Sequence, residues 1–73
     1  MTRDEWIAAF AREAGVAPPS IQEIRDLLEL AGNAAHASER TAAPLACWLA
    51  GRSGLTLEEL LAASARVAPL DGG

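Results

Sequence analysis

The sequence has no lysine and no tyrosine, one histidine, one cysteine and only three aromatic residues among its 73. A single cysteine excludes an intramolecular disulfide and a metal cluster built on several thiolates, and it suits a reducing compartment. The net charge is −4 and the pI is near 4.7. These values argue against nucleic acid and anionic membranes as partners, because both select basic surfaces.

Long apolar runs are also missing. No stretch approaches the roughly 18 apolar residues that a membrane span requires. Met1, Thr2 and Arg3 lead into two acidic residues, where a secretory signal would need an apolar segment. We therefore expect a cytoplasmic protein that does not cross a membrane.

The hydrophobic content is high, at 51%, but 17 of these residues are alanine. The length allows one small helical domain over residues 1–73, with a frayed tail over about 69–73. A core of this size rarely supplies more than about 3–5 kcal/mol. We expect a thin core, which either very close helix packing or a partner must supplement.

Three segments carry the start signal of a helix. Thr2 with Glu5, Ser20 with Glu23, and Thr56 with Glu59 each match the capping box, in which a hydroxyl and a carboxylate satisfy two backbone N–H groups reciprocally. Each match precedes an apolar stripe of helical period, and no segment alternates with the period of a strand. The sequence predicts an all-α fold, a compact antiparallel arrangement of four short helices over about 3–14, 21–38, 41–50 and 57–68.

The stripes identify the side chains expected to face the core. They are Trp6, Ile7, Phe10 and Ala14 in the first helix; Ile24, Leu27, Leu28, Ala31, Ala34 and Ala35 in the second; Leu45, Trp48 and Leu49 in the third; and Leu57, Leu60, Leu61, Ser64, Val67 and Ala68 in the fourth. As core anchors, the tryptophans would be costly to truncate, so Trp48→Ala is expected to unfold the domain. An exposed tryptophan would instead be a candidate interface hot spot.

Glycine and proline mark the expected boundaries. Gly15 suits the end of the first helix, Gly51 and Gly54 bracket the exit of the third, and Pro69 stops the fourth. Pro44 is tolerated only in a first turn. Gly32 lies inside the second helix at a cost of about 1 kcal/mol relative to alanine, which suggests a close approach by another backbone or a ligand.

The segment around the single histidine is the strongest candidate site. If the second helix continued without a break, Glu29, Asn33, His36 and Arg40 would form one polar stripe opposite the apolar one. Together with Glu39, the residues Asn33, His36 and Arg40 are candidates for binding a partner or an anion, with Glu29 and Arg52 as possible additions. The competing interpretation is a solvated helix face, with Glu39 and Arg40 capping the turn.

Chemistry at this segment has little support. A catalytic His36 would need a nucleophile, an orienting group and a pocket. Ser38 is unsuitable because it lies too close on the same helix, and Cys47 is not placed relative to the histidine. Metal sites need more ligands than His36 and the neighbouring carboxylates supply. We expect no enzyme activity, metal or cofactor, and an inert Cys47 opposite the apolar stripe of its helix.

Residues 30–45, followed by Trp48-Leu49-Ala50-Gly51, resemble a small uncharacterised helical domain of high-GC bacteria, and Trp6, Phe10 and Pro18-Pro19 extend the resemblance over about 4–68. Its motif reads AH-x-SER-x-AAP. That family occurs alone, fused to or beside proteins similar to molybdenum cofactor guanylyltransferases, and near formate dehydrogenase-type molybdoenzymes. The resemblance implies an accessory role in cofactor maturation or molybdoenzyme assembly, with His36, Glu39, Arg40 and Pro44 forming a recognition surface.

Three functional hypotheses remain open. The first is a non-enzymatic interaction module with a protein partner, which the resemblance places in a molybdenum system. The second is a small subunit that binds a nucleotide or pterin phosphate through Arg40 and His36, with Arg52 as a further contact. The third is a homodimeric helical module with no cofactor link. In the first, Arg40→Ala should weaken partner capture and leave the fold intact.

Overall fold

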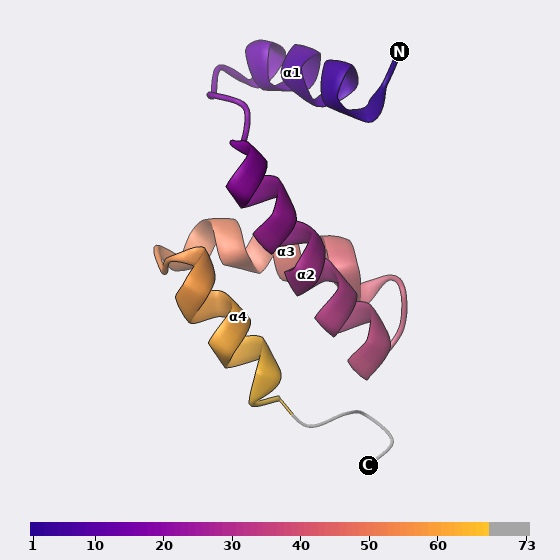
Figure 1. The fold of residues 1–73 in the computed structure, drawn as a ribbon, viewed down its shortest axis with the longest axis vertical. Coiled ribbons are helices and arrows are strands. Elements are labelled where there is room, and N and C mark those ends of the chain that lie inside the picture. Colours follow the sequence, from indigo (N-terminus) through magenta and orange to yellow (C-terminus); the bar gives the residue numbers. More distant parts are fainter. Residues whose placement is uncertain (68–73) are drawn as a thin grey trace.

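The computed structural model describes residues 1–67, and four α-helices contain most of them (Figure 1). They are α1 (Arg3–Ala14), α2 (Ile21–Ala37), α3 (Ala42–Ser53) and α4 (Leu57–Ala65). No strand occurs within residues 1–67, so the predicted all-α class with four helices is confirmed. The predictions for Ala68, for Pro69 as a helix stop and for a tail over 69–73 lie outside the described residues.

All three predicted capping boxes are present. The Glu5 backbone N–H donates to Thr2 Oγ1 at 3.1 Å, and the Thr2 backbone N–H donates to Glu5 Oε1 at 2.7 Å. The pairs Ser20–Glu23 and Thr56–Glu59 repeat this arrangement at the starts of α2 and α4. Helix starts are set locally in this chain, which is why they could be predicted from the sequence.

Two of these boxes make the domain sensitive to acid. Hydrogen bonds with the Thr2 backbone and then with its side chain hold the pKa of Glu5 below its ordinary value, and Thr56 does the same for Glu59. A pKa lowered on folding stabilises the fold fully above the ordinary glutamate value of about 4.3, and this contribution is lost as the pH falls through the folded-state pKa.

We therefore expect a variant with both Glu5→Gln and Glu59→Gln to lose less Tm than the wild type between about pH 5 and about pH 3. Thermal melts followed by circular dichroism measure the difference. Glu58→Gln removes a neighbouring exposed carboxylate that takes no part in a box, and it should keep the acid slope of the wild type. Equal slopes for all three proteins would show that the boxes do not cause the acid sensitivity.

Glycines end two helices in the left-handed conformation. Gly15 follows α1 with φ 76°, as predicted, and Gly54 follows α3 with φ 74°. The predicted end of the third helix at Ala50 is wrong, because the helix continues through Gly51 to Ser53. An interior glycine lowers helix stability without breaking the hydrogen-bond ladder, whereas the left-handed residue Gly54 ends it.

The other two boundaries are close to the predictions. α2 ends at Ala37, one residue before the predicted end, and Ser38 caps it. Thr41 precedes α3 without a side-chain capping bond. Pro44 lies in the first turn of α3, as expected, where the missing N–H has no partner to lose.

Helix α2 is the centre of the arrangement, and it packs against both α3 and α4. Figure 1 shows α3 crossing behind α2 and α4 descending in the same general direction as α2, as the second and fourth helices of an alternating arrangement do. α1 lies across the N-terminal end of α2, beyond the connector at residues 15–20. A hollow of about 160 Å³ separates the two, lined by Arg3, Asp4, Ile7, Pro19, Ile24, Leu27 and Leu28.

The core is as thin as the composition predicts. The buried residues among 1–67 are Ala11, Leu30 and Ala50, and no large side chain there is completely buried. The inner stripe predicted for α2 is half-buried apart from Leu28, which is exposed, while Leu30 is buried in its place. This shift follows from contact with both α3 and α4, because two neighbours bury a wider arc of the α2 surface than one stripe.

Both tryptophans depart from the prediction, since Trp6 is 54% exposed and Trp48 is 60% exposed. They are not core anchors, and the expected unfolding by Trp48→Ala is corrected accordingly. Phe10, Ala14, Leu45 and Leu49 are also exposed, against the prediction that they face the core, while Ile7 is half-buried as predicted.

The fourth helix largely follows its prediction, with Leu57, Leu60, Leu61 and Ser64 half-buried. Val67 is exposed rather than inward. It lies beyond the end of α4 at Ala65, so the helical period that placed it on the inner stripe no longer applies.

The prediction of a close approach at Gly32 is also wrong. A Cβ built on Gly32 would meet no heavy atom within 4 Å, and the same holds for Gly51. Neither helix glycine is required by its surroundings.

Candidate functional site: two exposed aromatic faces

The predicted polar stripe on α2 does not form as one row. Asn33 Nδ2 donates to Ser64 Oγ at 3.0 Å, and Ser64 Oγ donates to the Leu61 carbonyl at 2.8 Å. Asn33 therefore lies between α2 and α4, half-buried, where its amide links the two helices. This contact gives the residue a structural role that the sequence pattern did not show.

The remaining members of that set lie near the end of α2 but not on one helical face. His36 is exposed on the last turn, and Glu39 and Arg40 come after the helix has ended at Ala37. Glu39 Oε1 accepts from Thr41 Oγ1 at 3.1 Å, so this carboxylate supports the turn. Binding of a partner or an anion by these residues stays a prediction.

The two additional candidates lie apart from that turn. Glu29 is exposed on α2. Arg52 lies on the last turn of α3, where its guanidinium carbon is 4.7 Å from the centroid of the Trp48 ring. This is the geometry of a cation–π contact, so Arg52 belongs with the aromatic surface of α3.

The first apolar surface consists of Leu45, Trp48, Leu49 and Arg52, and is called the α3 face. These residues are spaced at i, i+3, i+4 and i+7, so they lie on one side of the helix. All of them are exposed. The opposite side, with Ala43, Ala46, Cys47 and Ala50, is buried or half-buried.

This orientation of α3 reverses the prediction that Leu45, Trp48 and Leu49 face the core. The side that packs on α2 is made of small residues, which allow close approach of two helix backbones. Cys47 lies on that packed side as a half-buried free thiol, which agrees with its predicted place opposite the large apolar side chains. The sequence of α3 contains one stripe of small residues and one of large apolar residues, and the pattern alone does not show which of them packs on α2.

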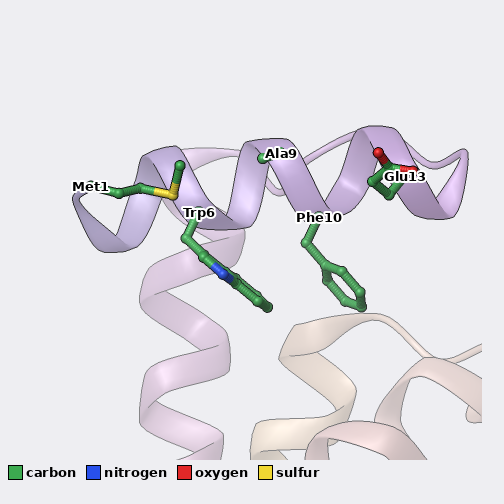
Figure 2. A pocket seen from close by; sticks show the side chains of 5 residues that line it. All are labelled: Met1, Trp6, Ala9, Phe10 and Glu13. Atoms are coloured by element: carbon green, nitrogen blue, oxygen red, sulfur yellow. The ribbon is translucent and has the colours of Figure 1, made fainter.

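The second apolar surface lies on α1 and is called the α1 face. Trp6 and Phe10 stack with ring centroids 5.1 Å apart and an interplanar angle of 26°. Figure 2 shows both rings leaving the same side of the helix, with Met1 at its N-terminal end and Glu13 on its last turn. Together with Ala9, these four residues line an open hollow of about 260 Å³.

Charge is distributed unequally between the two faces. Residues 41–57, which contain α3, carry one charged side chain, Arg52, although the chain has ten carboxylates. α1 carries three acids and two arginines, and Glu13 borders the hollow beside Phe10. Each face is thus an aromatic surface with a charged residue at its border, and the two border charges have opposite signs.

Neither hollow resembles a polar reaction site. The hollow beside Phe10 is lined by Met1 and residues of α1, and the hollow between α1 and α2 is lined by residues of these two helices and Pro19. Neither includes His36 or Arg40. Within residues 1–67, no three His, Cys, Asp or Glu side chains are grouped in a way that could hold a metal ion. In the same part of the chain, no helix combines the length and the apolar character needed to cross a bilayer.

Comparison with known protein families gives a match over most of the chain. Residues 1–70 match the family described as Domain of unknown function (DUF6457). No curated protein and no solved structure matches the chain.

Proposed function

Since the chain belongs to the DUF6457 family, whose description assigns no activity, we propose its function from the geometry: it is a non-enzymatic interaction module that acts by binding another protein chain. The observation that carries this proposal is the exposure of the α3 face. Leu45, Trp48 and Leu49 expose large apolar side chains there, and Arg52 lies against the Trp48 ring.

The energetics of burial favour covering this face. Full burial of a leucine-sized side chain contributes about 1.5–3 kcal/mol, yet the helix directs its alanines inward and its leucines and tryptophan outward. Contiguous exposed apolar surface on a small protein marks an interaction site. Tryptophan and arginine are also the residues most enriched among interface hot spots.

The polar turn after α2 fits the border of such an interface. His36, Glu39 and Arg40 are exposed, and Arg40 lies two residues before the start of α3 at Ala42. A polar rim around an apolar centre is the usual composition of a protein interface. We assign the apolar centre to the α3 face and the rim to these three side chains.

The domain family that the sequence resembles occurs beside molybdenum cofactor enzymes, and this association suggests the identity of the partner. The module would assist cofactor maturation or molybdoenzyme assembly in a high-GC bacterium, with a guanylyltransferase-like protein or a formate dehydrogenase-type subunit as the bound chain. Support for this step is the motif at residues 35–44, which contains all three rim side chains.

Tagged protein purified from its native host tests the proposal. We expect Trp48→Ala to reduce capture of the partner by about 30-fold or more, which is the effect of losing one hot spot. Arg40→Ala should reduce capture by less than about fivefold, because rim charges contribute little. Ile21→Ala truncates an exposed apolar side chain outside both faces, and should capture as the wild type does.

Mass spectrometry of the captured proteins then identifies the partner. A molybdenum cofactor enzyme or molybdoenzyme subunit that is lost with Trp48→Ala supports both parts of the proposal. Full capture by Trp48→Ala contradicts the assignment of the α3 face. A rise in the Tm of the isolated protein with added GTP, lost in Arg40→Ala, would instead favour the phosphate-binding alternative.

A further inference from the structure

The two aromatic faces have features that complement each other. On the α1 face, Trp6 and Phe10 border Glu13, and on the α3 face Trp48 carries Arg52 against its ring. α2 packs with α3 and α4 in the body of the fold, while α1 lies across its end (Figure 1). One chain therefore presents two separate apolar surfaces of matching chemistry.

The total surface indicates how much of the chain is left to cover. The accessible surface is 5733 Å², whereas a folded monomer of 7.6 kDa exposes about 4,300 Å². Residues 68–73 account for part of this difference. After the largest area that they could expose is subtracted, the accessible surface still exceeds the value expected for residues 1–67 alone by roughly 900 Å². A stable interface removes about 800 Å² from each partner, so the excess matches one interface per chain.

We propose that two copies of this chain associate around a twofold axis, with the α1 face of each copy covering the α3 face of the other. The proposal rests on the interaction function above: in the isolated protein a second copy covers these faces, and a host partner that binds the α3 face takes the place of that copy. A reciprocal contact closes the dimer and covers all four faces at once.

Charge favours this pairing over contact between two α3 faces. Each copy has a net charge of −4, so two copies repel each other when they associate. An interface that brings no two carboxylates together keeps this repulsion small. The α3 face has no carboxylate, and it can receive Glu13 of α1 opposite Arg52. Two α3 faces in contact would share only arginines, and two α1 faces would bring the acids of one helix to those of the other.

Sedimentation of the purified recombinant protein alone is the first experiment. We expect a dimer whose population rises with concentration between about 1 µM and about 500 µM. Trp48→Glu and Phe10→Glu should each weaken one α1–α3 contact by about 30-fold. Because the dimer contains this contact twice, each variant should raise the Kd of the dimer by on the order of 1,000-fold. Ile21→Glu makes the same substitution at an exposed site outside both faces, and should dimerise as the wild type does.

Mixing the two weakened variants distinguishes the reciprocal contact from other dimers. A heterodimer of Phe10→Glu with Trp48→Glu contains one contact in which both faces are unaltered and one in which both are altered. Effects of residues in contact are not additive, so a contact already broken by one glutamate loses little more from the second. The mixture should therefore associate more tightly than either variant alone. If instead α3 packed against α3, Phe10→Glu would dimerise as the wild type does, and Trp48→Glu alone would weaken the dimer. Circular dichroism of each variant alone checks that it keeps the helix content of the wild type, which this comparison requires.

Each outcome decides the proposal. Recovery of association on mixing supports it. A dimer that Trp48→Glu weakens and Phe10→Glu leaves unchanged overturns it in favour of an α3–α3 contact. Two variants that each weaken the dimer but show no recovery on mixing also overturn the reciprocal contact. A monomer at every concentration overturns it. In that case, Trp48-dependent capture of another protein from the host would still support the function proposed above.

Discussion

The Leu30→Ala variant is expected to be largely unfolded at 25 °C. Leu30 is 5% exposed, and among the buried residues of the described part of the chain, 1–67, it is the one with a large apolar side chain. It lies on α2, the helix that both α3 and α4 pack against. Truncating a buried leucine costs about 2–5 kcal/mol, while a core of this size supplies about 3–5 kcal/mol in total.

Urea unfolding followed by circular dichroism measures the effect, with all proteins at one concentration because association would shift the midpoint. Ile21→Ala is the matched control, since Ile21 is apolar and 77% exposed, and its midpoint should stay near that of the wild type. A Leu30→Ala protein as stable as this control would show that the packing around α2 does not hold the domain together.

Replacing the two glycines inside helices, Gly32 and Gly51, by alanine should stabilise the domain. Gly32→Ala with Gly51→Ala is expected to stabilise the domain by about 1–2 kcal/mol, because alanine costs less conformational entropy in a helix and neither new methyl group meets an atom within 4 Å. For a domain this small, that gain raises the Tm by roughly 5–15 °C.

Calorimetry on the double variant tests this expectation. Gly15→Ala and Gly54→Ala are informative controls, because both glycines have φ near 75°, where a Cβ is strained, and each should lower the Tm. A double variant no more stable than the wild type would contradict the open space around Gly32 and Gly51, since an added methyl group must then meet an atom of the folded chain.

What the sequence could predict is mostly local. The capping boxes at Thr2, Ser20 and Thr56 involve residues three positions apart, so their geometry does not depend on the rest of the fold. Gly15 ends α1 for an equally local reason. The helix count, the order and most boundaries follow from such signals, and so does the thin core, which is a matter of composition.

The orientation of α3 could not be predicted in the same way. This helix has an apolar stripe of large side chains and another of small ones, and periodicity alone favours the larger, more hydrophobic stripe as the core side. Close packing against α2 selects the stripe of Ala43 and Ala50 instead. The choice depends on how near two backbones can approach, which is a property of the pair of helices.

The candidate site changed for a related reason. Asn33 was grouped with His36 and Arg40 on the assumption that one helix continued past residue 40. The chain leaves that helix at Ser38, and α4 provides Ser64 as a hydrogen-bond partner for Asn33. The surfaces at Trp6 and Trp48 were assigned to the core because large aromatic side chains are usually buried.

The exposed tryptophans give the molecule a built-in optical signal. The chain has two tryptophans and no tyrosine, and Trp6 and Trp48 belong to different faces. Near-ultraviolet emission therefore comes almost entirely from these two surfaces. A tryptophan-to-phenylalanine change at either position leaves the other face as the sole emitter, so the occupation of each face can be followed separately in unlabelled protein.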